Sequence, residues 1–186
     1  GLADYLIKKK IRVLGPDKFA SQLEGSKAFM KNLCKKNNIP TASFGVFDNF
    51  NDASSFIKKK GVPIVVKADG LASGKGVMIC GSTSEALKNV KEILDGKFKS
   101  SSKVILEEFL EGEELSYFAI VDEKSYNFFG SAQDHKRVGE GDVGPNTGGM
   151  GAYSPAPLLT KKIEKKIKKK IIDPTLKAMK NLGHPY

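Results

Sequence analysis

The chain has 186 residues, of which 40% are hydrophobic and 28% charged, and its formal net charge is +10 at pH 7. This length suffices for one hydrophobic core and a second small subdomain, and no apolar run approaches the roughly 20 residues of a membrane helix. The charge comes mostly from lysine, and Arg12 and Arg137 are the only arginines, whereas nucleic-acid readout and stacking require arginine and interleaved aromatic residues. We therefore expect solvated lysine faces, no specific nucleic-acid partner, no membrane span and no secretory leader.

Hydrophobic periodicity and capping signals predict three helices before residue 100. They run from Ser26 to Asn37, from a cap at Asn51 or Asp52 to Gly61, and from the capping box of Ser82 and Glu85 to Gly96. A further helix begins at about Thr160, where isoleucines recur on one face, and Pro174 either interrupts it or starts its next segment.

Short β-branched and aromatic runs predict five strands. They are Pro63–Val66, Val77–Cys80, Lys103–Phe109, Leu115–Val121 and Tyr126–Ala132. Residues 122–125 predict a turn, and residues 139–157 are rich in glycine and proline with little periodicity, which predicts an irregular segment. Because helices interleave with strands, the fold class is α/β (α+β).

Two cysteines, Cys34 and Cys80, stand in apolar surroundings and lack the spacing of metal ligands. Such cysteines are typical of buried thiols in a reducing compartment. We therefore expect a cytoplasmic protein without disulfides.

The first candidate site is the segment VVKADGLASGKGV, which lies between two predicted strands. It does not fit the P-loop pattern, because only three residues separate Gly70 from Gly74, and Lys75 is followed by Gly76 and a strand. Glycines nevertheless let backbone N–H groups approach a phosphate closely, and Lys67 and Lys75 could each offer a positive charge. A plain turn between two strands remains the alternative.

The second candidate site is EEFLEGEELS, where five glutamates fall within residues 107–114. A solvated acidic hairpin is one interpretation. The other is a nucleoside site, in which a strand end pairs with the adenine edge and a carboxylate accepts from the ribose hydroxyls.

The third candidate site is QDHKR, residues 133–137, followed by a glycine-rich stretch that ends at Pro155. Consecutive polar residues directly after an apolar strand are difficult to explain by packing. The glycine-rich stretch could wrap an anionic ligand or act as a flexible linker, but its Asn, Thr, Met, Tyr and Pro residues are unusual for a linker.

Taken together, these stretches resemble the phosphoribosylamine–glycine ligases of the ATP-grasp superfamily. The resemblance covers nearly the whole chain and is carried by LEGSK, IPTA, PIVVKADGLASGKGV, EEFLEGEELS, QDHKR and GPNTGGMGAYSPAP, in the order of the family. It implies a partial ATP-grasp fold and an enzyme that joins glycine to 5-phosphoribosylamine with ATP, through an acyl phosphate, in purine biosynthesis. Another ATP-grasp carboxylate–amine ligase and, from a different class, a basic nucleic-acid-binding module are the alternatives.

The resemblance also implies roles for individual residues. Lys27 and Lys67 would hold the ATP phosphates, residues 72–77 would form a mobile flap, residues 107–110 would line the adenine, and Glu114 would contact the ribose. The full set of nucleotide-binding residues is Lys27, Lys67, Gly70, Ser73, Gly74, Lys75, Gly76, Val77, Glu107, Glu108, Phe109, Leu110 and Glu114.

The remaining roles concern the two small-molecule substrates. The catalytic set is Lys67, Asp134, His135, Lys136 and Arg137, and the substrate-binding set is Asn146, Thr147, Gly148, Gly149 and Met150. His135 could equally be a structural histidine. Which residues face glycine and which face phosphoribosylamine stays open.

The resemblance further implies a division of the chain and a missing part. Residues 1–20 would be the end of an N-terminal amine-substrate domain, and residues 21–42 would be a linking helix and the start of the ATP-grasp fold. Residues 43–113 would form the ATP-grasp lid subdomain, and residues 114–186 would form part of the larger ATP-grasp subdomain. The chain starts with Gly1 and ends at Tyr186, so we expect a fragment. The family uses Mg²⁺ (or Mn²⁺), whose ligands would lie beyond Tyr186, and we therefore expect no metal ligand in this chain, no activity from it alone, and a monomer.

Overall fold

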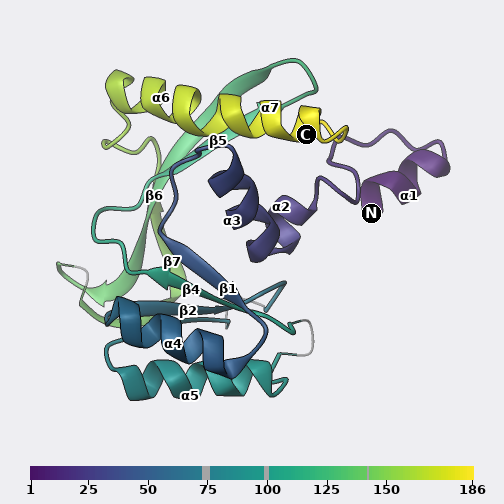
Figure 1. Cartoon of the computed structure of the whole chain (residues 1–186). Helices are drawn as coiled ribbons and strands as arrows, with labels where there is room; N and C mark the ends of the chain where they lie inside the picture. The colour runs from purple at the N-terminus through teal and green to yellow at the C-terminus, as the bar shows by residue number, and fades with distance from the viewer. Residues whose placement is uncertain (73–75, 99–100, 142) are drawn as a thin grey trace. The chain divides into compact units, whose positions relative to one another are not determined.

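The computed structural model describes residues 1–72, 76–98, 101–141 and 143–186, with only the backbone for residues 136–138 and 143–150. The chain divides into two compact units, unit 1 from Gly1 to Glu111 and unit 2 from Gly112 to Tyr186. Figure 1 shows the elements of both units. A search of the described residues found no helix with the length and apolar character needed to cross a membrane.

Unit 1 is built from five helices and four strands within its described residues. They are α1 (Leu2–Lys8), α2 (Gln22–Gly25), α3 (Lys27–Lys36), β1 (Phe44–Phe47), α4 (Phe50–Lys60), β2 (Ile64–Ala68), β3 (Val77–Cys80), α5 (Thr83–Leu94) and β4 (Val104–Glu108). The strands form one sheet in the order β1-β4-β2-β3, and every pair is antiparallel. The expected strand–loop–strand arrangement around VVKADGLASGKGV is thus confirmed as the β2–β3 pair.

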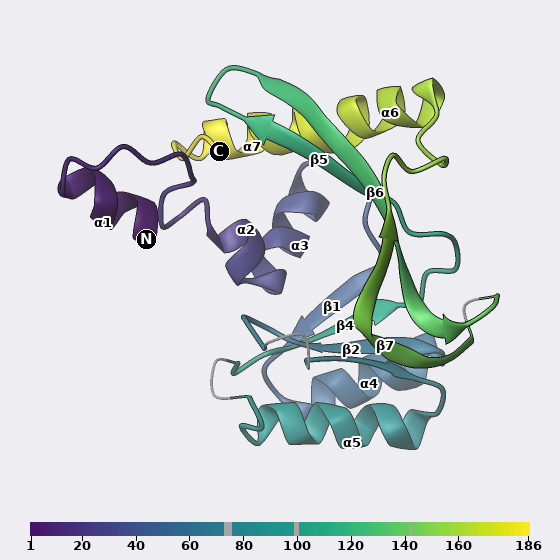
Figure 2. The same ribbon diagram turned by 180° about the vertical axis from the view of Figure 1, so that it is seen from behind.

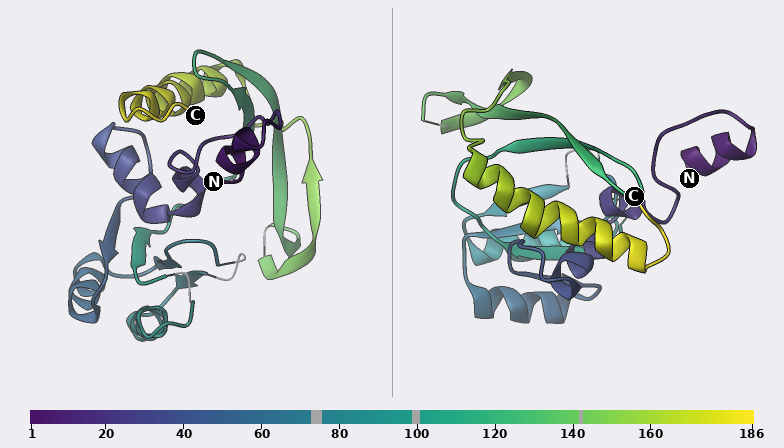
Figure 3. Two further views of the ribbon diagram at one scale, coloured as in Figure 1. Left: turned by 90° about the vertical axis from the view of Figure 1, so that its right-hand side faces the viewer. Right: turned by 90° about the horizontal axis from the view of Figure 1, so that it is seen from above.

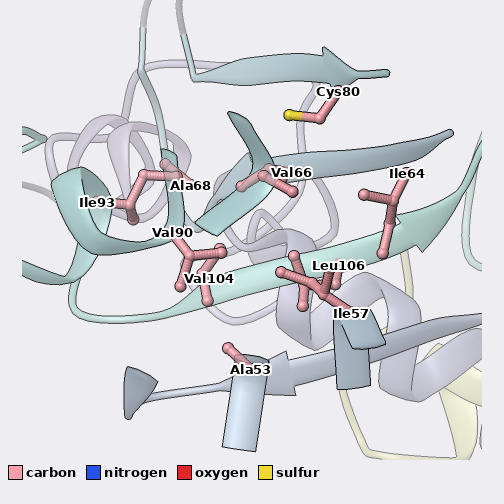
Figure 4. Packing of buried hydrophobic residues seen from close by; sticks show 11 residues of the cluster. Ala53, Ile57, Ile64, Val66, Ala68, Cys80, Val90, Ile93, Val104 and Leu106 are labelled. Atoms are coloured by element: carbon pink, nitrogen blue, oxygen red, sulfur yellow. The ribbon is translucent and has the colours of Figure 1, made fainter. Parts of the chain in front are cut away.

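The core of unit 1 lies between this sheet and the helices α4 and α5, which Figure 3 (left) shows side by side against the strands. Alternate residues of β2 and β4 point toward the helices, because side chains alternate across a strand. Figure 4 shows Val104 near Val90 and Leu106 beside Ile57. Burial of each aliphatic side chain of this size contributes about 1.5–3 kcal/mol. Both cysteines are buried free thiols, as the sequence predicts.

Side-chain caps explain where the main helices of unit 1 begin. Ser26 accepts a hydrogen bond from the backbone N–H of Phe29 at the start of α3, and Ser82 accepts from that of Glu85 at the start of α5. The cap at Ser82 is as predicted, whereas Ser26 was predicted only as the first residue of its helix. The expected cap of α4 at Asn51 or Asp52 was wrong, because Asn49 has the extended backbone of a cap and accepts from the N–H of Asp52.

Unit 2 combines a three-stranded sheet with one interrupted helix. Its elements are β5 (Ser116–Val121), β6 (Tyr126–Gly139), β7 (Val143–Tyr153), α6 (Lys161–Ile167), the π-helical segment η1 (Lys168–Ile172) and α7 (Asp173–Asn181). The strand order is β5-β6-β7, with antiparallel pairs that Figure 2 shows as long arrows. The helix passes through η1 directly before Pro174, which lies in the first turn of α7. Proline lacks the N–H that would continue α-helical hydrogen bonding. Pro174 therefore starts the next segment of the helix, which was one of the two roles predicted for it.

The structure corrects the prediction for residues 133–157. The strand predicted to end at Ala132 continues to Gly139, and the stretch predicted as irregular contains β7. The register shifts between His135 and Arg137 and again between Arg137 and Gly139. Glycine has a weak intrinsic preference for strands, but pairing with a neighbouring strand overrides that preference. The sequence pattern alone therefore missed this strand.

Candidate functional site

The candidate nucleotide site of unit 1 lies on the face of the sheet opposite α4 and α5, which we call the second face. Val65 pairs with Glu107 in register, and Lys67 pairs with Ile105 on one side and Val77 on the other. Since these residues have the opposite parity to the core residues of β2 and β4, their side chains lie on the second face. Lys67, Val77 and Glu107 from the predicted set therefore share one surface.

Glu107 is the centre of a buried group of charges, the Lys31–Lys67–Glu107 cluster. Its Oε2 atom lies 2.7 Å from Nζ of Lys31 and 3.0 Å from Nζ of Lys67. The side chains of Lys31 and Glu107 are each only 5% exposed, whereas that of Lys67 is 25% exposed. One carboxylate oxygen thus holds two ammonium groups, of which only Lys67 reaches solvent to a substantial degree.

The other carboxylate oxygen of Glu107 is buried and has no hydrogen-bond partner among the described residues. A buried polar atom without a partner costs about 1–3 kcal/mol, so such an atom is expected where a ligand supplies the partner. A donor group of a ligand on the second face, such as an exocyclic amino group, would satisfy this oxygen.

The first turn of α3 is attached to the beginning of the glycine-rich loop. The Asp69 carboxylate accepts hydrogen bonds from the backbone N–H of Ala28 at 3.1 Å and from the hydroxyl of Ser26 at 3.2 Å. Nζ of Lys27 donates to the carbonyl oxygen of Gly70 at 2.7 Å. A carboxylate at the N-terminus of a helix also interacts favourably with the helix dipole. Lys27 is therefore positioned at the loop that begins two residues after Lys67.

Two glycines shape the described ends of this loop. Gly70 has φ +77, a conformation that favours glycine, and a Cβ atom on Gly76 would lie 2.6 Å from Cβ of Ala72. The backbone N–H of Ala68 donates to the carbonyl of Gly76 at 2.8 Å, which closes the loop. Ser73, Gly74 and Lys75 lie outside the described residues.

The predicted adenine-lining residues after Glu107 differ in their surroundings. Glu108 is held at the end of β4, where its carboxylate accepts a hydrogen bond from the backbone N–H of Ser43 at 2.8 Å. This hydrogen bond lowers the pKa of the Glu108 carboxyl below its usual value. Phe109 and Leu110 are exposed apolar residues, as a hydrophobic ligand contact requires. Glu114 belongs to unit 2.

In unit 2, Asp134 and His135 of the predicted catalytic set lie on β6 opposite the end of β7. Asp134 pairs with Ala152 and His135 with Gly151. The ring of His135 lies 5.3 Å from that of Tyr153, centroid to centroid, and the hydroxyl of Tyr153 donates to Oε1 of Gln133 at 2.6 Å. This ring contact is compatible with the alternative that His135 has a structural role. The side chains of Lys136, Arg137, Asn146, Thr147 and Met150 lie outside the described residues, and Gly148 and Gly149 belong to β7.

Sequence reasoning missed Lys31 and Asp69 as members of the site. Lys31 looked like one more lysine of a solvated helix, although it stands directly beside the apolar residues of α3 in the sequence. A lysine next to an apolar helical stripe is the signal that could have pointed to a buried cation. Asp69 follows a strand immediately before a glycine, which the pattern favoured as turn chemistry.

The chain was compared with known proteins by sequence and by fold. The model of the family described as phosphoribosylglycinamide synthetase, ATP-grasp (A) domain, matches residues 25–186. The chain belongs to this family. Membership in the phosphoribosylglycinamide synthetase family confirms the expected ATP-grasp fold and the resemblance found in the sequence.

Relatives of known name agree with this assignment. The phosphoribosylamine–glycine ligase of Brucella melitensis is 51% identical over 187 residues, which is 100% of this chain and 44% of that protein. The crystal structure of the Thermotoga maritima phosphoribosylamine–glycine ligase superposes with a TM-score of 0.87 at 37% identity, over 100% of this chain and 47% of that one. The chain therefore spans less than half the length of the relatives it matches.

The fold extends to enzymes outside the synthetase family. The biotin carboxylase domain of the 2-oxoglutarate carboxylase from Hydrogenobacter thermophilus, solved with the magnesium salt of ADP and bicarbonate, gives a TM-score of 0.72. At 21% identity over 98% of this chain and 39% of that one, this likeness concerns the fold alone. A shared fold does not by itself specify a substrate.

Proposed function

We propose that this chain is the nucleotide-binding part of a cytoplasmic phosphoribosylamine–glycine ligase, which joins glycine to 5-phosphoribosylamine and converts ATP to ADP and phosphate. One observation carries the proposal. Lys67 lies near the end of β2, directly before the glycine-rich loop, and Lys27 donates to the carbonyl oxygen of Gly70 at the start of that loop. Two lysines thus flank one glycine-rich loop, which supports a phosphate site at this loop.

The proposed chemistry is activation of a carboxylate. The glycine carboxylate attacks the γ-phosphoryl group, which gives an acyl phosphate and ADP, and the amine of phosphoribosylamine then displaces phosphate. In this scheme Lys27 and Lys67 neutralise phosphate charge and align the nucleotide, because phosphoryl transfer depends mainly on positioning and electrostatic stabilisation. The free oxygen of Glu107 supports an adenine position on the second face, since it would accept from the 6-amino group.

Magnesium is part of the proposal, but no residue described here is assigned to it. Among the described residues, no group of three or more His, Cys, Asp or Glu side chains could hold a metal ion. The expectation that the metal ligands lie beyond Tyr186 stays a prediction. So do the lid role of residues 43–113, the substrate roles of residues 134–137 and 146–150, and the monomeric state.

The proposal is tested by expressing the complete reading frame that encodes this chain. We expect ADP formation that requires both glycine and phosphoribosylamine, with glycinamide ribonucleotide as the product. ATP turnover stimulated by another carboxylate and amine, such as a pair of D-alanine molecules, would favour the alternative of a different ATP-grasp ligase. Tight oligonucleotide binding that weakens steeply with salt, without ATP turnover, would favour the nucleic-acid-binding module.

A further inference from the structure

Lys31 is a deeply buried charged residue of the candidate site, and the sequence did not predict that it belongs there. It lies on α3, and its Nζ atom contacts Oε2 of Glu107 at 2.7 Å and the hydroxyl of Thr41 at 2.7 Å. The same ammonium group lies 5.7 Å from the centroid of the Phe44 ring. Burying a lysine is costly unless its charge is compensated. These contacts provide that compensation and fix the position of the ammonium group.

Lys31 and Lys67 compete for the same carboxylate oxygen of Glu107. Lys31 has a second partner in Thr41 and is buried, whereas Lys67 is partly exposed and, among the described residues, bonds only to Glu107. If Lys67 moves toward an anion, Glu107 keeps an opposite charge at 2.7 Å. If Lys31 were absent, the same movement would leave the buried carboxylate unpaired, which is strongly unfavourable.

We propose that Lys31 is a positioning residue: it holds the charge of Glu107 so that Lys67 can leave this carboxylate and bind a nucleotide phosphate. The inference rests on the proposed function and assigns Lys31 no contact with the nucleotide. Its action is exerted through Glu107. The inference therefore predicts that Lys31 matters for phosphate binding only while position 107 carries a negative charge.

A purely structural role for Lys31 makes a different prediction. Loss of a structural lysine would lower the melting temperature and weaken all ligands of unit 1 alike. Loss of a residue that frees Lys67 would weaken ligands that carry phosphate and spare those that do not. The ratio of the adenosine dissociation constant to the ADP dissociation constant measures this difference, because the two ligands differ only in the diphosphate.

The experiment measures this ratio for the wild-type chain and four variants by ligand-observed NMR. The variants are Lys31→Met, Glu107→Gln, the double variant Lys31→Met/Glu107→Gln, and Lys35→Met as a control on the exposed side of α3. We expect Lys31→Met to lower the ratio by about tenfold or more, as the loss of a charge-assisted hydrogen bond implies. The double variant should restore the ratio to that of Glu107→Gln, and Lys35→Met should match the wild type.

Several results would overturn the inference. They are an unchanged ratio in Lys31→Met, an equal weakening of adenosine and ADP, and a double variant whose ratio stays below that of Glu107→Gln. Should Lys31→Met fail to fold, the last comparison still decides, because the double variant contains no buried unpaired charge. A wild-type chain that binds neither ligand would refute the proposed function and the inference together, whereas normal wild-type binding with an unaffected ratio refutes the inference alone.

Discussion

The ammonium group of Lys67 lies 3.0 Å from Oε2 of Glu107, diagonally across the β2–β4 pair of the sheet. The lysine that the sequence predicts at the nucleotide phosphates is therefore held by a buried carboxylate. Glu107 also binds Lys31, so the carboxylate does not depend on Lys67 alone. The proposed phosphate-binding role of Lys67 can therefore be tested without leaving Glu107 unpaired.

Lys67→Ala should weaken ATP binding by roughly 10- to 100-fold, since a hydrogen bond to a charged group contributes about 1.5–3 kcal/mol. The melting temperature should change little, because Lys31 still compensates Glu107. Calorimetric titration with ATP and thermal unfolding measure the two effects. Lys165→Ala, an exposed substitution on α6, serves as the control. Unfolding of Lys67→Ala with unchanged ATP affinity in the remaining folded protein would show that Lys67 has a structural role.

Gly76→Ala should destabilise the base of the glycine-rich loop. The new Cβ atom would lie 2.6 Å from Cβ of Ala72 and 3.3 Å from that of Ala68, so the backbone must shift. Overpacking of this kind costs on the order of 1–3 kcal/mol. Urea unfolding followed by circular dichroism measures the change. Gly81→Ala is the matched control, because nothing lies within 4 Å of its added Cβ atom, and equal stabilities of the two variants would contradict the described loop.

Asn49→Ala should cost about 1 kcal/mol of stability, because Asn49 caps α4 through its hydrogen bond to the backbone N–H of Asp52. Asn51→Ala should change the stability by less than about 0.5 kcal/mol, as exposed substitutions usually do. Urea unfolding of both variants compares the two positions directly. A larger loss for Asn51→Ala would instead favour the cap that the sequence pattern predicted.

Glu108→Gln should reduce the acid sensitivity of the chain. The hydrogen bond from the Ser43 N–H lowers the pKa of the folded Glu108 carboxyl, so its contribution to stability is present above the usual pKa of about 4.3 and is lost as pH falls through the lowered value. The wild type should therefore lose more stability than Glu108→Gln between pH 7 and about pH 3. Unfolding titrations at both pH values test this, with Glu111→Gln as the control, and parallel losses in all three proteins would contradict it.

The parts of unit 1 that the sequence predicted correctly are those governed by local chemistry. The cap at Ser82 acts on an N–H group in the first turn of its own helix, and Gly61 ends α4 as predicted, with a positive φ of 79° that favours a residue without a side chain. Such signals involve only residues that are neighbours in the sequence, so they can be recognised without knowledge of the fold. The two strands around the loop were likewise visible as short apolar runs.

The parts that were missed depend on contacts between distant residues. β7 consists largely of glycine and small residues and is a strand only because β6 pairs with it. Lys31 is a site residue only because the fold brings Glu107 to it. The position of Lys31 beside the apolar stripe of α3 allows its burial, but neither the β6–β7 pairing nor the contact of Lys31 with Glu107 follows from spacing along the chain.

The central claim is that nucleotide phosphate binds to Lys27 and Lys67 at the glycine-rich loop. A crystal structure of the chain with a non-hydrolysable ATP analogue tests it most directly. The account predicts phosphate oxygens about 3 Å from Nζ of both lysines, with Lys67 displaced from Glu107 and Lys31 still bound to it. Phosphates bound elsewhere, such as at the exposed lysines of residues 161–170, while Lys67 remains on Glu107, would contradict it.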